Sequence, residues 1–232
     1  MRQVVFDTET TGLDPKKGHR IVEIGCVEII GRKITGRHFQ TYIDPEREID
    51  ADASKITGLT WAALKGYPVF KDIVSEFLDF IRGSTLIIHN APFDMGFLNH
   101  EFGLLYGERE KPEKHIQGII DTLAMARKIH PNQGNSLDAL CKRYKINNQH
   151  RIKHGALLDS EILAELYLSM TAGQLKFDFT AAEEEETSIC LSEQFSHSEI
   201  KAIESIYQRK LLNLPVVQAS SEALTLDATR FL

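Results

Sequence analysis

The chain has 232 residues, a hydrophobic content of 42% and a formal net charge of −6 at pH 7. This size and composition predict one substantial core of about 170 residues with an appendage, and they exclude a fibrous or wholly disordered protein. Neither a long apolar run nor a charged leader before an apolar stretch is found, so we expect no membrane span and no secretory signal, and the cytoplasm is the expected compartment. Three scattered cysteines without a C-x-x-C pair argue against disulfide bonds and against a zinc site.

The first predicted element is a buried strand that ends near Phe6 and is followed by Asp7 and Glu9. Because side chains alternate along a strand, both carboxylates project from one face and Thr8 projects from the other. Two carboxylates that share a patch repel each other, and a divalent metal is the simplest partner that relieves the repulsion. A strand end with two solvated acids is the alternative, and the D-x-E pattern alone favours it.

The later elements follow from the periods of apolar residues and from turn residues. Strands are expected at residues 21–30, 37–43, 85–88 and 118–122, short helices and turns at 50–65, and helices at 69–82, 91–105, 123–130, 136–145 and 154–170. The first three strands fit an antiparallel meander. The strand and helix alternation after them predicts a mixed sheet covered by helices, since a crossover helix normally joins parallel strands.

Two further carboxylates lie on apolar helix stripes. Asp94 follows Pro92, a natural residue for a first helical turn, and aligns with Phe97, Leu98 and Phe102. We expect Asp94 to face inward, although an acid placed to favour the helix dipole is an alternative.

Asp159 aligns with Ile162, Leu163 and Leu166 in the same way. Burying a lone charge costs several kcal/mol, so Asp159 requires a partner in the core. His154 lies just before this helix and can reach the same place, while an ordinary surface histidine is the alternative.

The segment between residues 125 and 155 is locally basic. Against the single acid Asp138, it contains Arg127, Lys128, Lys142, Arg143, Lys145, Arg151 and Lys153. Such a stretch predicts a surface for nucleic-acid phosphates, with a solvated helical surface as the alternative.

Together, Asp7, Glu9, Asp94 and Asp159 supply oxygen ligands from three elements, which favours Mg²⁺ or Mn²⁺. The chemistry that suits such a site is phosphodiester cleavage with two metals about 3.5 to 4 Å apart. His154 is then the expected general base, since a positioned imidazole with a pKa of about 6.5 can remove the proton of water near neutral pH.

Residues 6–12, 89–94 and 154–159 resemble the three motifs of the DEDDh 3′-to-5′ exonucleases, and the resemblance covers about residues 2–171. It implies an α/β, ribonuclease-H-like fold with a mixed five-stranded sheet flanked by helices. It also implies metal ligation by Asp7, Glu9, Asp94 and Asp159, with His154 as the base. The implied activity is removal of mismatched 3′-terminal nucleotides during DNA replication, releasing nucleoside 5′-monophosphates with two divalent cations.

The resemblance further implies contacts to the 3′-terminal nucleotide. These fall on Asp7, Thr8, Glu9, Thr10, Gly12, Leu13, Asp52, Thr57, Asn90, Phe93 and Asp159. A histidine is common in the family where Thr57 stands, and core packing is an alternative role for Phe93. A frayed 3′ end enters a site walled by helices more easily than a paired one, so mismatch preference needs no readout of bases.

We expect residues 1–173 to form the exonuclease domain, 174–195 a linker and 196–232 a C-terminal segment. In the linker, Gln174, Leu175, Phe177 and Phe179 are similar to the sliding-clamp-binding peptides of such proteins, with packing back on the domain as the alternative. Residues 196–199 form a capping box before an apolar stripe, and an isolated helix of this length is marginal in water. The segment is therefore expected to fold against a partner, which the resemblance implies to be the polymerase (alpha) subunit. A small theta-like subunit is a further implied partner.

Two other functions fit parts of the sequence. A stand-alone DEDDh exonuclease acting on RNA or single-stranded DNA ends would have the same core, and the tail discriminates it from a polymerase subunit. A non-catalytic adaptor would keep the fold only to present its tail. The presence of all five candidate active-site residues argues against the adaptor.

Overall fold

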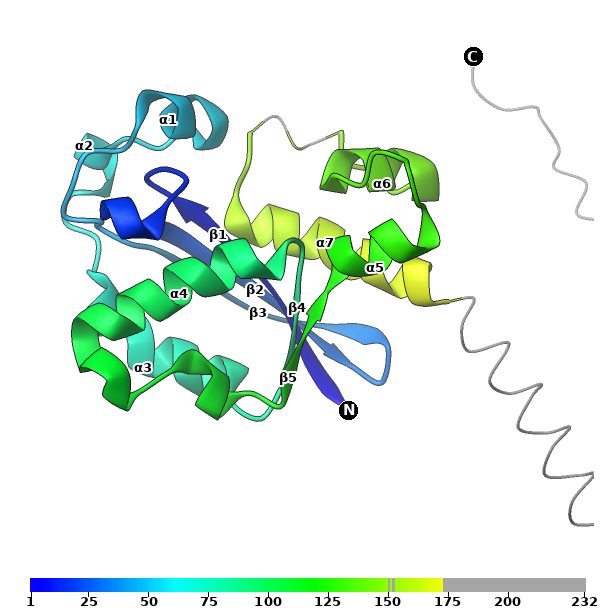
Figure 1. Cartoon of the computed structure of the whole chain (residues 1–232), viewed down its shortest axis with the longest axis horizontal. Helices are drawn as coiled ribbons and strands as arrows, with labels where there is room; N and C mark the ends of the chain where they lie inside the picture. The colour runs from blue at the N-terminus through cyan, green and yellow to red at the C-terminus, as the bar shows by residue number, and fades with distance from the viewer. Residues whose placement is uncertain (150, 152, 173–232) are drawn as a thin grey trace, which may run out of the picture. The chain divides into compact units, whose positions relative to one another are not determined.

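The computed structural model describes residues 1–149, 151 and 153–172. The chain divides after Gln174 into two units, and the described residues belong to the first. They form one sheet with the strand order β3-β2-β1-β4-β5 (Figure 1). The strands are β1 (Arg2–Thr10), β2 (Ile21–Ile30), β3 (Lys33–Tyr42), β4 (Thr85–Ile88) and β5 (Gly118–Asp121).

The sheet is mixed, as the sequence predicts: β1, β2 and β3 are antiparallel, while β4 runs parallel to β1 and β5 parallel to β4. Two strands extend beyond their predicted bounds. β1 continues past Phe6 to Thr10, and β3 begins at Lys33 instead of residue 37. In both cases the antiparallel partner β2 supplies hydrogen-bonding groups beyond the apolar run, so pairing decides the strand length.

Helices cover both faces of the sheet (Figure 1). Val4 and Phe6 of β1 pack with α3 and α4, whereas Val5 packs with α5, α6 and α7. This is the alternation that a strand with two buried faces requires. The helices are α1 (Ala51–Thr57), α2 (Trp61–Leu64), α3 (Phe70–Ile81), α4 (Ala91–Tyr106), α5 (Thr122–Ile129), α6 (Leu137–Tyr144) and α7 (Ala156–Thr171), with 3₁₀ turns η1 (Pro15–Lys17), η2 (Gly107–Arg109) and η3 (Pro112–His115).

The first residues of α7 lie directly against β2. Gly25 stands opposite Asp7 in the register of the sheet, and a Cβ at Gly25 would overlap the main chain of Ala156 and Leu157. The Ser160 hydroxyl donates a hydrogen bond of 3.0 Å to the Gly25 carbonyl oxygen. The absence of a side chain at Gly25 therefore lets α7 begin beside Asp7.

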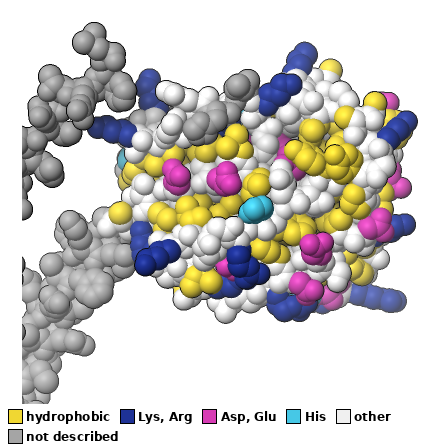
Figure 2. All heavy atoms as spheres, turned by 180° about the vertical axis from the view of Figure 1, so that it is seen from behind, with side chains coloured by type: hydrophobic (Ala, Val, Ile, Leu, Met, Phe, Trp, Pro, Cys, Tyr) yellow, Lys and Arg dark blue, Asp and Glu magenta, His cyan; other side chains and the backbone are white. Residues whose placement is uncertain are grey.

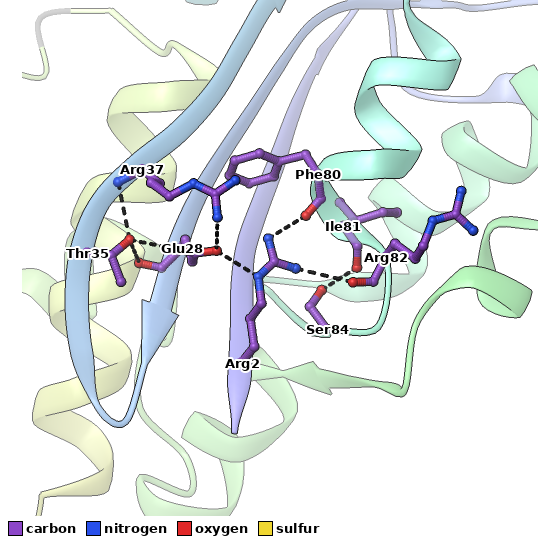
Figure 3. A network of polar contacts seen from close by, with 8 residues as sticks. All are labelled: Arg2, Glu28, Thr35, Arg37, Phe80, Ile81, Arg82 and Ser84. Atoms are coloured by element: carbon purple, nitrogen blue, oxygen red, sulfur yellow. Dashed lines mark hydrogen bonds and ion pairs between the residues drawn. The ribbon is translucent and has the colours of Figure 1, made fainter.

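A polar network fastens β1, β2 and β3 to the end of α3 (Figure 3). The buried carboxylate of Glu28 accepts hydrogen bonds from Arg2 Nε (2.7 Å), Thr35 Oγ1 (2.9 Å) and Arg37 Nη1 (3.1 Å). Arg2 also donates to the carbonyl oxygens of Phe80 and Arg82. Glu28 and Arg2 thus tie together four elements of the fold.

No helix in the described part of the chain has the length and apolarity needed to span a bilayer. Figure 2 views the molecule from behind, where apolar side chains form patches with a few acidic side chains among them, and lysines and arginines lie mainly toward the rim. Among the described side chains, this face therefore offers no continuous basic surface for a phosphate backbone.

Candidate active site

Three carboxylates lie near the end of β1, two of them on β1 itself and the third on α4. Asp7 and Glu9 point to the side of the sheet that carries α7, and Thr8 points to the side of α4. The main-chain nitrogen and the hydroxyl of Thr8 donate hydrogen bonds of 3.0 and 2.7 Å to one oxygen of Asp94, in the first turn of α4. The predicted inward orientation of Asp94 is confirmed, since its exposed fraction is 3%.

The fourth carboxylate and the histidine come from the start of α7. Asp159 is 4% exposed, as its stripe predicts, and its Oδ2 lies 3.5 Å from His154 Nδ1. The main-chain nitrogen of His154 donates to the Ile56 carbonyl oxygen (3.2 Å), which anchors this loop to α1. Ligand atoms of Glu9, His154 and Asp159 all lie within 4.8 Å of one another.

Burial and mutual repulsion disfavour the ionised forms of Asp7, Glu9 and Asp94. Burial, followed by the charges of Asp94, Glu9 and Asp159, raises the pKa of Asp7 well above its ordinary value. Burial raises the pKa of Glu9 to about 8, with a further contribution from Asp159. Burial also raises the pKa of Asp94 to about 7, although the Thr8 hydrogen bonds oppose the rise. Each of these groups gains from a proton or a cation beside it.

This donor set fits a divalent cation. The four carboxylates offer hard oxygen ligands, and burial together with mutual repulsion favours a cation beside Asp7, Glu9 and Asp94. No cysteine joins the cluster, since the described cysteines, Cys26 and Cys141, are free and buried in the core.

A cavity of about 650 Å³ opens over the carboxylates. Of the substrate-contact residues predicted from the sequence, its walls contain Asp7, Thr8, Glu9, Thr10, Gly12, Leu13, Asp52, Thr57, Phe93 and Asp159. Asn90 instead lines an adjoining cavity of about 730 Å³, together with Arg127 and Asn135. All of the predicted contact residues except Asn90 therefore line one cavity, and their contact with a nucleotide stays a prediction.

Several wall residues have a second role that the structure explains. The ring of His19 packs so closely on Gly12 that a Cβ there would overlap it, and His19 Nδ1 lies 3.0 Å from Thr11 Oγ1. Leu13, beyond this support, is 83% exposed. The Thr57 hydroxyl donates to the Ala53 carbonyl oxygen (3.0 Å) and accepts from Leu59 N (3.1 Å), so it helps to end α1. Phe93 lines the cavity and also packs on Phe97, with ring centres 5.0 Å apart.

Four of the described residues divide the two cavities, and the sequence predicts a catalytic role for only one of them, His154. His89, Leu137, Arg151 and His154 line both. Arg151 was counted only as part of a basic stretch, yet its guanidinium pairs with Asp159. His89 belongs to a recognised motif, but its hydrogen bond with Thr122 Oγ1 (3.0 Å) has no signal in the local sequence.

A mixed five-stranded sheet with four carboxylates and a histidine at the end of its central strand is the arrangement of a metal-dependent exonuclease. The exonuclease family matches residues 4–167. Among solved structures, exonuclease X in complex with 5′ overhanging duplex DNA is 29% identical, covers 74% of this chain and 92% of its own, and superposes with a TM-score of 0.58. The predicted fold class is therefore confirmed.

The named relatives of this chain indicate a particular branch of the exonuclease family. DNA polymerase III subunit epsilon of Salmonella typhimurium is 46% identical over 99% of this chain and 91% of its own length. The protein of the same name from Rickettsia prowazekii is 52% identical over 75% of this chain and 76% of its own. The chain therefore belongs to the exonuclease family, in the branch of the DNA polymerase III epsilon subunits.

Two predictions lie outside the described residues. They are the clamp-binding peptide with Gln174, Leu175, Phe177 and Phe179, and the C-terminal helix that follows it. The division of the chain into three segments likewise stays a prediction.

Proposed function

We propose that this chain is the proofreading subunit of a DNA polymerase III complex, a 3′-to-5′ exonuclease that removes mismatched 3′-terminal nucleotides as nucleoside 5′-monophosphates. The observation that carries the proposal is the convergence of Asp7, Glu9, Asp94, Asp159 and His154 on one cavity. Work on replicating DNA would place the protein in the cytoplasm.

Asp7, Glu9, Asp94 and Asp159 would hold two divalent cations, Mg²⁺ or Mn²⁺. When bound, such cations neutralise charge on the phosphate and activate water for attack. Because burial and mutual repulsion raise the pKa values of Asp7 and Glu9, a bound cation would relieve the charge of these carboxylates. Hard oxygen donors favour Mg²⁺ and Mn²⁺ over softer metals.

His154 would remove the proton of the attacking water. Its side chain is 44% exposed and stands at the mouth of the carboxylate cluster, so a water molecule can reach it. A positioned imidazole contributes about 10²- to 10⁴-fold to a rate.

The walls would position the 3′ end. The exposed Leu13 and the ring of Phe93 offer apolar surface on which the terminal base or sugar can pack. Asn90 would contact the 3′-terminal nucleotide from the adjoining cavity, where Arg127 would meet phosphates of the strand. A 3′ end would have to leave its template to enter this cavity, so frayed mismatched ends should enter more readily than paired ends.

The C-terminal part would attach this activity to the replication machinery. The similarity to the Salmonella epsilon subunit extends over nearly the whole chain, including the segment after residue 173. We propose that Gln174, Leu175, Phe177 and Phe179 bind the sliding clamp and that residues 196–232 bind the polymerase (alpha) subunit. A small theta-like subunit is a third proposed partner.

The test is degradation of a 3′-labelled primer, paired or terminally mismatched on a DNA template, with Mg²⁺. Wild type should remove the mismatched end faster, and His154→Ala should slow removal by about 10²-fold or more. His38→Ala, which changes an exposed histidine of β3, is the matched control and should leave the rate unchanged. Equal removal of paired and mismatched ends, or faster removal from an RNA primer, would favour the stand-alone exonuclease instead.

A further inference from the structure

Arg151 lies in the wall between the two cavities and contacts Asp159, Asp138 and His154. Its Nε and Nη2 donate to the two oxygens of Asp159 at 2.5 and 2.8 Å. Its Nη1 donates to Asp138 Oδ1 (2.7 Å), and its Nη2 lies 2.9 Å from His154 Nδ1. The Arg151 and Asp159 side chains are 8% and 5% exposed, so this pair is shielded from solvent.

The Arg151 guanidinium engages both carboxylate oxygens of Asp159, which a metal ion would need as ligands. A bidentate guanidinium engages both oxygens of a carboxylate, and it holds a full positive charge beside them. A cation at Asp159 would meet that charge at short range in a site with little water. Arg151 and a metal ion therefore compete for the same carboxylate.

The same guanidinium also engages the histidine. Because arginine only donates hydrogen bonds, the contact with His154 requires Nδ1 to accept with its lone pair. A general base needs a free lone pair for the proton of water. In this arrangement Arg151 thus restrains the candidate base as well as the candidate ligand.

Asp138 gives the guanidinium a second position. Its side chain is 61% exposed and lines the adjoining cavity, away from the carboxylate cluster. An Arg151 side chain that leaves Asp159 can therefore keep one carboxylate partner and gain solvent. Without Arg151, by contrast, Asp159 would lose the arginine that pairs with both of its oxygens and would remain a buried charge in the metal-free protein.

We propose that Arg151 is an internal counter-ion of the metal site: it neutralises Asp159 in the metal-free protein, and metal binding displaces it from Asp159 toward Asp138. This inference rests on the proposed function, since it assigns Asp159 to the metal. It makes Arg151 a positioning residue, whose exchange of partners is coupled to occupancy of the site.

The test is calorimetric titration of the full-length chain with Mn²⁺, together with melting temperatures in chelator and in Mn²⁺. Arg151→Gln should bind Mn²⁺ about tenfold more tightly, because no buried pair has to be broken. Its metal-free melting temperature should fall and its metal-induced rise should grow. Arg143→Gln is the matched control, since Arg143 donates to Asn135 and to the Gly134 carbonyl oxygen. It should bind Mn²⁺ as wild type does.

Arg151→Lys distinguishes displacement of the guanidinium from a general effect of its positive charge on metal binding. It keeps the positive charge but loses the fork that grips both oxygens of Asp159, so it should also bind Mn²⁺ more tightly than wild type. Affinity equal to wild type in Arg151→Lys would mean that charge alone matters and would overturn the proposal.

Asp138→Asn keeps the test decisive if Arg151→Gln does not fold. This change removes the carboxylate that would hold the displaced guanidinium, so it should weaken Mn²⁺ binding by about threefold. If Arg151→Gln and the double variant both fold, the same change should have no effect in the Arg151→Gln background. Unchanged affinity in Asp138→Asn overturns the proposal, as does equal or weaker binding by a folded Arg151→Gln. Wild type that binds no Mn²⁺ would overturn the proposed metal site as well, whereas normal binding and mismatch removal would leave the proposed function standing.

Discussion

At the scale of single residues, this fold treats buried carboxylates in two opposite ways. Glu28 is buried, which by itself raises its pKa, but hydrogen bonds from Arg2 and Thr35 outweigh burial and bring the pKa below its ordinary value. Glu9 and Asp94 are also buried, yet their pKa values are raised to about 8 and about 7. The first environment satisfies an anion for stability, whereas the second leaves anions in need of a cation.

Glu28 should therefore carry a pH-dependent share of the stability. Its pKa is lowered on folding from an ordinary 4.5, so its contribution is present above that value and is lost as the pH falls through the lower folded pKa. Glu28→Gln should cost about 1 to 3 kcal/mol of unfolding free energy near pH 7, because it leaves arginine donors unpaired. The cost should shrink below about pH 4.5, as urea unfolding at a series of pH values would measure.

Glu76→Gln is the control for that series. Glu76 is an exposed acid of α3, and its replacement should change the unfolding free energy by less than about 0.5 kcal/mol. A Glu28→Gln cost that is the same at pH 7 and at pH 3.5 would contradict the assigned role of the ionised carboxylate.

At the scale of elements, the site depends on how closely α7 approaches the sheet. The strand β2 carries Gly25 beside Asp7, and the first turn of α7 rests on that glycine. His154 and Asp159 are fixed relative to Asp7 through this contact and through the Ser160 hydrogen bond. Gly25 therefore has a steric role, which is to let the first turn of α7 approach β2.

Gly25→Ala should push α7 away from β2. The added methyl group would overlap main-chain atoms of Ala156 and Leu157, and such overpacking typically costs about 1 to 3 kcal/mol. Removal of a mismatched 3′ nucleotide should fall by about 10²-fold, since a shift of about 1 Å in a catalytic group has that effect. Gly103→Ala in α4, where an added Cβ meets nothing within 4 Å, should instead raise stability by about 0.5 to 1 kcal/mol at full activity. Full activity in both variants would exclude the steric role of Gly25.

At the scale of the whole molecule, the site lies where both helical layers meet the central strand. Asp94 arrives from the layer of α3 and α4, and Asp159 from the layer of α5, α6 and α7. β1 supplies Asp7 and Glu9 between them. The active site therefore requires the folded first unit as a whole, whereas the proposed partner contacts belong to the rest of the chain.

A chain truncated after Ala172 should separate these two functions. It retains every described element, so its cleavage of a free mismatched primer should stay within about threefold of the full-length rate. Its binding to the polymerase subunit and to the clamp, measured by surface plasmon resonance, should be lost. Phe177→Ala in the full-length chain should weaken only clamp binding. Partner binding retained by the truncated chain would refute the assignment of these contacts to the tail.

Much of the site follows from the sequence, because its signals are local. The spacing of apolar residues turns Asp94 and Asp159 inward on α4 and α7, and strand alternation puts Asp7 and Glu9 on one face. These patterns depend only on the periods of helix and strand. The order of the elements was likewise enough to predict a mixed sheet with helices on it.

Only the tertiary structure decided which residues of different elements contact one another. The pairing of Arg151 with Asp159, the wall that assigns Asn90 to a second cavity, and the continuation of β1 to Thr10 all depend on partners that no local period encodes. The sequence does not distinguish Arg151 from the other six basic residues of its stretch. Its pairing with the buried Asp159 arises only from the folded position of the loop before α7. Local periodicity determines which way a side chain faces, but long-range packing determines what it meets.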